Sequence, residues 1–231
     1  MENSDDYILK VSDLSVRIQN QTILDNVSFK LKKGTTLAIV GPNGAGKTVL
    51  FKALLNLIPY TGNIEWSGKI KMGYVPQNLT AGDIPISVRE FLAFKGCPGI
   101  EGCLDTVGLV DESIMDKRLG TLSGGQFQRV LIAWAIHDEP NVLLFDEPTS
   151  AVDIDNEEAI YEMLNRLEKE NEITVLIISH DIHLIQDYSG YMLALNRKVI
   201  FFGESERIVE PDILKLIYGS EVLLVKHVRG G

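Results

Sequence analysis

The sequence has no apolar run long enough to span a bilayer, and it is short of positive charge. Its first ten residues, MENSDDYILK, lack the basic start and the apolar stretch of a secretory signal. We therefore expect a cytoplasmic chain that reaches a membrane only through a protein partner. With 22 Lys and Arg against 32 Asp and Glu, the formal net charge is −10. This charge argues against a general affinity for DNA, RNA or anionic lipid, so no nucleic-acid partner is expected.

Cysteine is also scarce, because Cys97 and Cys103 are the only two and they flank a Pro-Gly turn. They could form a disulfide or half of a metal site. A reducing cytosol and the lack of a further Cys or His nearby in the sequence favour two thiols instead.

The remaining composition is that of a globular protein with one sizeable core. Of the 231 residues, 45% are hydrophobic and 23% are charged, and no low-complexity tract or internal repeat is present. We expect a single domain over residues 1–231. Three short apolar runs rich in β-branched residues predict strands buried on both faces of a parallel sheet. These runs are TLAIV (36–40), NVLLF (141–145) and ITVLII (173–178).

Helical patterns alternate with these runs, as a doubly wound α/β layer requires. The predicted helices cover residues 47–57, 124–137, 155–170 and 181–187. Further strand-like pieces suggest an antiparallel sheet beside the parallel one. These pieces are ILKVSDLSVRI near the start, and IEW, KMGY, YMLAL and KVIFF later in the chain.

Residues 78–121 differ from this alternating pattern and predict an inserted helical lobe. The lobe contains two short helix candidates separated by a Gly-Cys-Pro-Gly turn. Ser87 and Glu90 form an S-x-x-E capping box, which predicts where the first helix begins. A set of apolar residues on the lobe forms either a groove for a membrane partner's helix or the lobe's own core, and we expect some to serve each purpose. The set is Ile84, Ile86, Val88, Phe91 and Phe94.

The run GPNGAGKT, residues 41–48, follows the first predicted strand and opens the first predicted helix. It fits the phosphate-loop pattern G-x-x-x-x-G-K-[ST] in the context that the pattern requires. Glycines let backbone amides form a nest for phosphate oxygens, and the helix start adds partial positive charge. Lys47 would reach the terminal phosphates, and Thr48 would offer its hydroxyl to Mg²⁺.

Two carboxylates, Asp146 and Glu147, end the second predicted strand. They emerge at the C-terminal edge of the sheet, where ligands of α/β folds bind. Asp146 is suited to hold the hydration shell of Mg²⁺, whereas Glu147 could orient or deprotonate an attacking water. The alternative is a solvated acidic turn closed by Pro148, but the phosphate loop favours catalysis.

The stretch LSGGQFQR, residues 122–129, is the most diagnostic in the chain. Ser123 can cap the following helix, and Gly124 and Gly125 allow a phosphate to approach the helix start. With this motif the sequence resembles the nucleotide-binding subunits of ABC transporters over essentially its whole length. The resemblance implies an ABC ATPase fold: a phosphate-loop NTPase core with a parallel sheet, an N-terminal antiparallel β subdomain and the inserted helical subdomain.

The resemblance also implies roles for single residues. The signature touches ATP bound to another subunit, so one copy of each motif implies a homodimer in the ATP-bound state. Gln77 resembles the glutamine near the Mg²⁺ and the attacking water, and His180 the switch histidine at the γ-phosphate. Asp153, in SAVDIDN (150–156), resembles the D-loop aspartate that crosses the dimer boundary, although it could equally cap the next helix. His180 and His183 lack a third ligand, which argues against a metal site.

Three groups of site residues follow for hydrolysis of MgATP. Catalysis is assigned to Lys47, Gln77, Glu147 and His180. Nucleotide binding is assigned to Gly41, Pro42, Asn43, Gly44, Ala45, Gly46, Lys47, Thr48, Val49, Ile18, Ser123, Gly124, Gly125, Gln126 and Asp153. The Mg²⁺ ligands are Thr48, Gln77 and Asp146. Ile18 departs from the family pattern, which has an aromatic residue there to stack on adenine, so we expect a loosely held base.

Kinship is the only sequence clue to the cargo. Residues GYVPQNLTAGDIPISVREFLAF and LALNRKVIFFGESERI resemble those of zinc and manganese importer ATPases. This likeness implies integral membrane permease subunits as partners, an extracytoplasmic metal-binding protein as an indirect one, and a peripheral position on the inner face of the membrane. The alternatives are a ferric-chelate importer ATPase, a soluble ABC ATPase of an assembly pathway, and a regulatory ABC protein acting on ribosomes or DNA. The last is disfavoured because the chain has neither a second cassette nor a long coiled-coil insertion.

Overall fold

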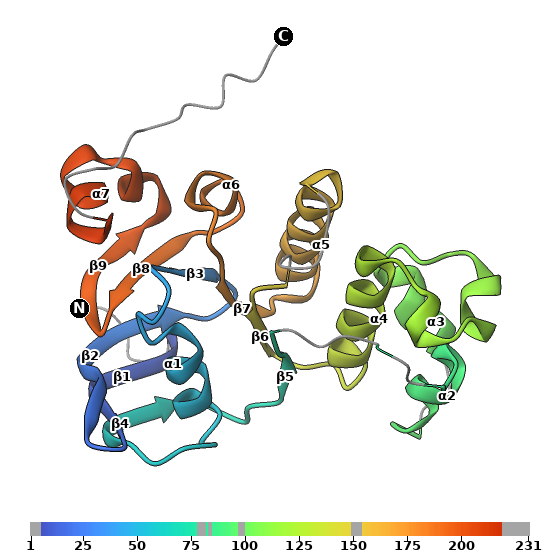
Figure 1. Cartoon of the computed structure of the whole chain (residues 1–231), viewed down its shortest axis with the longest axis horizontal. Coiled ribbons are helices and arrows are strands. Elements are labelled where there is room, and N and C mark those ends of the chain that lie inside the picture. The colour runs from blue at the N-terminus through green and yellow to red at the C-terminus, as the bar shows by residue number, and fades with distance from the viewer. Residues whose placement is uncertain (1–5, 78–81, 83–84, 97–99, 149–153, 219–231) are drawn as a thin grey trace, which may run out of the picture.

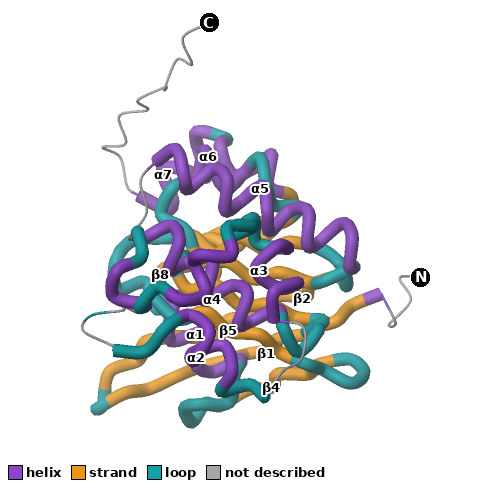
Figure 2. Tube along the Cα trace, turned by 90° about the vertical axis from the view of Figure 1, so that its right-hand side faces the viewer, coloured by secondary structure: helices purple, strands orange, loops and turns teal. Residues whose placement is uncertain are grey.

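Two β-sheets form the centre of the protein, with helices packed around them (Figures 1 and 2). The computed structural model describes residues 6–77, 82, 85–96, 100–148 and 154–218. The smaller sheet has the strand order β2-β1-β4, and the larger has the order β5-β6-β7-β3-β8-β9. The smaller sheet consists of β1 (Tyr7–Ile18), β2 (Gln21–Lys32) and β4 (Thr61–Trp66). The larger consists of β3 (Thr36–Val40), β5 (Met72–Val75), β6 (Val142–Asp146), β7 (Thr174–Ile178), β8 (Tyr191–Asn196) and β9 (Lys198–Glu204).

The three central strands β3, β6 and β7 are buried at every position. Alternate side chains of a strand point to opposite faces, and here each face meets its own hydrophobic core. Leu37 and Ile39 of β3 join the core beneath the smaller sheet, whereas Ala38 and Val40 join the core on the other face. The continuous apolar runs in the sequence therefore reflect a sheet covered on both sides.

Five strands of the larger sheet are parallel, and β9 is an antiparallel edge. The three predicted central strands are confirmed, and so is the antiparallel sheet that contains β1 and β4. Three assignments were wrong, because KMGY, YMLAL and KVIFF belong to the larger sheet. KMGY and YMLAL form its parallel strands β5 and β8, and KVIFF forms β9, which is antiparallel as predicted but pairs with β8. Strand direction depends on the long connections that precede these strands, and a short apolar run carries no such information. Strand β2 was not predicted, although its buried Val27, Phe29 and Leu31 alternate with polar residues as in a strand that is buried on one face.

The four predicted helices are all present, and their boundaries differ from the predicted ones by at most three residues. They are α1 (Lys47–Leu54), α4 (Gly124–Ile136), α5 (Ile154–Asn171) and α6 (Ile182–Gln186). An unpredicted helix α7 (Pro211–Tyr218) follows β9. Within residues 78–121 lie α2 (Val88–Ala93), α3 (Ile100–Thr106) and two 3₁₀ turns, Glu112–Asp116 and Leu119–Thr121.

Helices α2, α3 and α4 lie together on one side of the sheets (Figure 1). The predicted capping box is confirmed at α2: the Ser87 hydroxyl accepts from the Glu90 amide at 3.2 Å, and the Glu90 carboxylate accepts from the Ser87 amide at 2.7 Å. The apolar lobe residues differ in burial, and the groove for a membrane partner stays a prediction. Val88 is fully buried and the Phe91 ring stacks on Trp134 at 4.5 Å, whereas Phe94 is 74% exposed. Ile84 lies outside the described residues.

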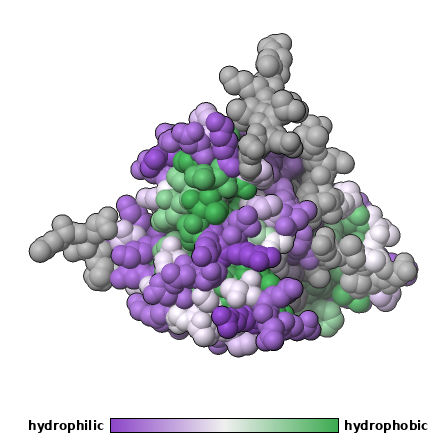
Figure 3. Space-filling model, turned by 60° about the vertical axis from the view of Figure 1, so that its left-hand side comes forward, coloured by the Kyte–Doolittle hydropathy of each residue, from purple (hydrophilic) through white to green (hydrophobic). Residues whose placement is uncertain are grey.

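Several large apolar side chains are exposed on the described surface, among them Leu57, Phe94, Val110 and Leu216. Hydrophilic residues dominate the face shown in Figure 3, and hydrophobic residues gather there in limited areas between them. Among the described helices none has the length and hydropathy that crossing a bilayer requires. The described residues also contain no cluster of three metal-ligating side chains. Cys103 lies 3.3 Å from the His137 Nδ1, a neighbour that the sequence did not predict, and Cys97 lies outside the described residues.

Candidate functional site

Residues 41–48 form the turn from β3 into α1, and two of their glycines are required by the backbone. Gly46 is the N-cap of α1 in a left-handed conformation, φ 99°, with no capping side chain. A side chain at Gly41 would place its Cβ 2.1 Å from the carbonyl oxygen of Leu195 on β8. The helix start therefore leaves its first amides available for an anion.

The ammonium group of Lys47 is buried against this turn. It donates to the carbonyl oxygens of Gly41 at 2.9 Å and Pro42 at 3.3 Å. Burial lowers the pKa of Lys47, while the carboxylates of Glu147 and Asp146 oppose that shift. A phosphate group would add a direct ionic partner for this ammonium group, which donates to two carbonyl oxygens here.

Asp146, at the end of β6, is only 1% exposed. Its Oδ1 accepts a hydrogen bond from the Thr48 hydroxyl at 3.2 Å, and its buried Oδ2 has no partner within the described part of the chain. Burial is the main reason that the pKa of Asp146 is raised. Burial and the same carboxylate also raise the pKa of nearby Tyr74 to about 12. A hard cation with oxygen ligands fits this unpartnered oxygen and the adjacent hydroxyl.

Glu147, the next residue, has a left-handed backbone with φ 53°. This conformation is unfavourable for a residue with a Cβ, and such outliers concentrate at functional sites. The Gln77 amide donates to Glu147 Oε2, and the His180 Nε2 lies 2.6 Å from Glu147 Oε1. Two loops that are far apart in the sequence thus converge on one carboxylate.

A cavity of about 330 Å³ adjoins several of these groups, although Asp146 and His180 do not line it. Most of the predicted phosphate-loop residues line it, together with Gln77 and Glu147. The lining residues are Ile23, Asn43, Gly44, Ala45, Gly46, Lys47, Thr48, Val49, Gln77 and Glu147. Ile23 on β2 was missed, because only the packing of β2 on the phosphate loop brings it there. Ile18, which is 45% exposed at the end of β1, does not belong to this lining.

The signature residues lie elsewhere. Ser123 is the N-cap of α4 and forms a capping box with Gln126, with both hydrogen bonds at 3.2 Å. Gly124 and Gly125 form the first helical turn, and none of these four residues lines the phosphate-loop cavity. Asp153 lies outside the described residues. Within one chain, the structure therefore does not bring the signature to the phosphate loop.

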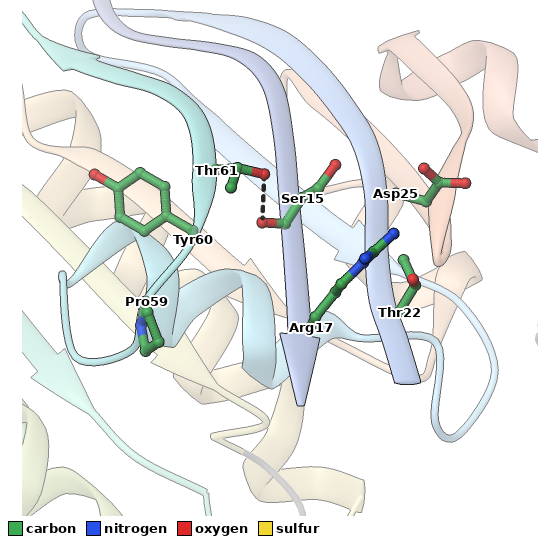
Figure 4. Close-up of a pocket in the computed structure, with 7 residues that line it drawn as sticks. All are labelled: Ser15, Arg17, Thr22, Asp25, Pro59, Tyr60 and Thr61. Atoms are coloured by element: carbon green, nitrogen blue, oxygen red, sulfur yellow. Dashed lines mark hydrogen bonds between the residues drawn. The ribbon is translucent and has the colours of Figure 1, made fainter. Parts of the chain in front are cut away.

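A second cavity, of about 410 Å³, opens on the smaller sheet (Figure 4). The Thr61 hydroxyl donates to the Ser15 carbonyl at its centre, while Arg17 and Asp25 project from β1 and β2. It contains none of the predicted site residues. The phosphate-loop cavity is therefore the candidate active site.

Known proteins resemble this chain over nearly its full length. The sequence pattern described as "ABC transporter" matches residues 24–150. The zinc import ATP-binding protein ZnuC of Pseudomonas savastanoi pv. phaseolicola is 34% identical, with 96% of this chain and 86% of that protein covered. An ATP-binding protein of Thermotoga maritima, assigned to a metal transport system, is 38% identical over 96% of this chain and 95% of its own length. A solved ABC transporter in an inward-facing conformation, assigned to the metal-chelate type, is 28% identical with a TM-score of 0.81, covering 92% of this chain and 89% of its own.

Proposed function

This chain is an ATP-hydrolysing member of the ABC transporter family, and from that premise we propose that it powers import of a divalent metal ion, zinc or manganese, through membrane permease subunits. The observation that carries the hydrolytic part is the convergence of Gln77 and His180 on the strained Glu147. This carboxylate adjoins the cavity of a phosphate loop, where an attacking water would be needed.

The phosphate loop supplies binding and charge stabilisation. The amides at the start of α1 and the Lys47 ammonium would hold the phosphates, with Asn43 and Gly44 completing the lining. Thr48, Asp146 and Gln77 would hold Mg²⁺, which neutralises phosphate charge when bound. The unpartnered Asp146 Oδ2 supports this assignment.

Water activation is assigned to Glu147. Its carboxylate would orient the water and accept its proton, while His180 would hold that carboxylate and contact the γ-phosphate. Catalysis then comes chiefly from positioning and electrostatics, as is general for phosphoryl transfer.

A second copy of this chain would complete the site. The helix start at Ser123, Gly124 and Gly125 has the chemistry of an anion site, yet these residues do not line the cavity of their own chain. A homodimer in which each α4 faces the partner's phosphate loop would use both features. Asp153 is assigned to the boundary between the two copies in this homodimer.

The proposed cargo follows from the relatives. One is named as a zinc import protein, and another is assigned to metal transport. The permease would carry the metal, so the lack of a metal cluster among the described residues is not relevant to this assignment. Phe94 and Val110, 74% and 75% exposed, are apolar positions on the lobe available to a permease helix. The chain would then lie on the inner face of the membrane.

A transport assay tests this proposal. The full chain is coexpressed with its permease, copurified, reconstituted into vesicles with the metal-binding protein, and supplied with MgATP. We expect ATP-dependent uptake of radioactive zinc or manganese, abolished by Lys47→Ala and preserved by Lys52→Ala on the exposed face of α1. Uptake of a ferric chelate alone would reassign the cargo. Failure to copurify with any membrane protein would favour the assembly-pathway alternative.

A further inference from the structure

A chain of buried polar groups lies directly behind the loop that carries His180. The Tyr161 hydroxyl, on α5, lies 3.1 Å from the hydroxyl of Ser179, the residue before His180. Tyr161 is 1% exposed and Ser179 is 3% exposed. A buried hydroxyl without a partner is costly, so this pair holds α5 and the loop in one relative position.

Ser179 is held at several points. Its amide donates to the Ile39 carbonyl of β3 at 3.2 Å, and its hydroxyl accepts from the Asp181 amide at 3.2 Å. The backbone before His180 is therefore bonded to β3 through the Ser179 amide. The backbone after His180 is bonded to the Ser179 hydroxyl through the Asp181 amide. The His180 ring itself is solvent-exposed, and its contact with Glu147 at 2.6 Å depends on where this backbone lies.

Each of the two hydroxyls also lies within reach of a second acceptor. Tyr161 can donate to Glu157 Oε1 at 3.4 Å, and Ser179 can donate to the Asp181 carbonyl at 3.4 Å. If both did so, no proton would remain between the two hydroxyls. The Tyr161–Ser179 bond therefore coexists with at most one of these two outer bonds, and it links α5 to the His180 loop whichever hydroxyl donates.

From this geometry we infer that Tyr161 and Ser179 are positioning residues that place His180 against Glu147 for hydrolysis. The inference rests on the proposed ATPase function of the site. Neither residue touches the phosphate-loop cavity, so both act through His180. Loss of one hydroxyl should slow hydrolysis and leave ATP binding unchanged.

The test uses the full chain with Tyr161→Phe, which removes one oxygen and keeps the buried ring. Single-turnover hydrolysis should fall about tenfold, equivalent to about 1.4 kcal/mol in the barrier, with the Kd for ATP within about twofold of wild type. Ser179→Ala should slow hydrolysis at least as much, because it also removes the acceptor of the Asp181 amide. Adding Tyr161→Phe to Ser179→Ala should cost little more, because the bond between the two hydroxyls is already lost. The control is Tyr188→Phe: the Tyr188 ring stacks on Tyr161 at 5.8 Å, but its hydroxyl donates to the exposed Glu158. This control should retain the wild-type rate.

The decisive measurement repeats Tyr161→Phe in a His180→Ala background. If Tyr161 acts through His180, the substitution has no further effect there. A persistent tenfold loss would overturn the inference in favour of a general structural role. The ¹⁵N shifts of the His180 imidazole should also move in Tyr161→Phe and stay unchanged in Tyr188→Phe. A wild-type rate in Tyr161→Phe refutes the inference alone, whereas absence of hydrolysis by wild type would refute the proposed function.

Discussion

At the residue scale, Glu147 combines an unfavourable backbone conformation with contacts to two loops. The fold maintains this conformation because Asp146, one residue earlier, is fixed by burial and by Thr48. Adjacent acids therefore point to different partners, and their proposed tasks can be separated by substitution.

Glu147→Gln should bind ATP normally and hydrolyse it about 10²–10⁴-fold more slowly, the range expected for loss of a general base. The amide keeps the size of the side chain but accepts no proton. Single-turnover phosphate release with equilibrium ATP titration measures both effects. Glu206→Gln, at an exposed position, serves as the control. An unchanged rate in Glu147→Gln would contradict the assignment of the base.

Asp146→Asn should raise the melting temperature of the nucleotide-free protein by about 2–4 °C, as expected for about 1 kcal/mol in a chain of this size. Burial raises the pKa of Asp146, so the folded state binds its proton more tightly than the unfolded state. This carboxylate therefore disfavours folding increasingly as pH rises through its titration range. The gain should be larger at pH 8 than at pH 4 in thermal denaturation. Equal gains at both pH values would contradict this account.

Base recognition should be weak, since Ile23 lines the cavity and no aromatic side chain of the described residues does. We expect ATP to bind less than about a thousandfold more tightly than GTP or CTP, because apolar contacts distinguish poorly between such bases. Competition titrations check this expectation. Ile23→Ala should weaken ATP binding about fivefold. Ile18→Ala is the comparison variant, because Ile18 is the position that the family pattern predicted to contact adenine. A thousandfold preference for ATP would overturn the expectation.

At the scale of elements, the lobe depends on short helices with well-defined starts. The Ser87 backbone and side chain both bond to Glu90, and these bonds lower the pKa of the Glu90 carboxyl. The lowered pKa means that the ionised form stabilises the cap. This stabilisation is present above the ordinary pKa of glutamate and is lost as pH falls below it.

Ser87→Ala should therefore open α2 locally without unfolding the sheets. Amide exchange at Glu90 should accelerate about fivefold, as loss of one N-cap implies. The difference from wild type should shrink in acid, where Glu90 is protonated. Hydrogen exchange followed by NMR measures the exchange rate of the Glu90 amide, with Ser113→Ala as a control outside the α2 cap. Unchanged protection at Glu90 would show that the cap does not stabilise α2.

At the scale of the whole molecule, the phosphate loop and the α4 start are separate features of one chain. Mixing Lys47→Ala chains with Ser123→Arg chains tests whether two copies share a site. Each variant alone should be inactive, but a mixed dimer retains one site built from the intact halves. Random pairing should restore about a quarter of the wild-type rate. Hydrolysis at the full rate by a species shown to be monomeric would contradict the shared site.

Local sequence patterns predicted the phosphate loop, the central strands, the main helices and the α2 cap. These features depend on neighbours within a few residues: glycine spacing, apolar period and capping side chains. The tertiary structure alone decided the directions of β5 and β8, the place of Ile23 in the cavity, and the approach of Gln77 and His180 to Glu147. It also decided the Tyr161–Ser179 contact. Each of these features brings together residues that are distant in the sequence. How closely such residues approach depends on the packing of the sheets, about which local sequence patterns carry no information.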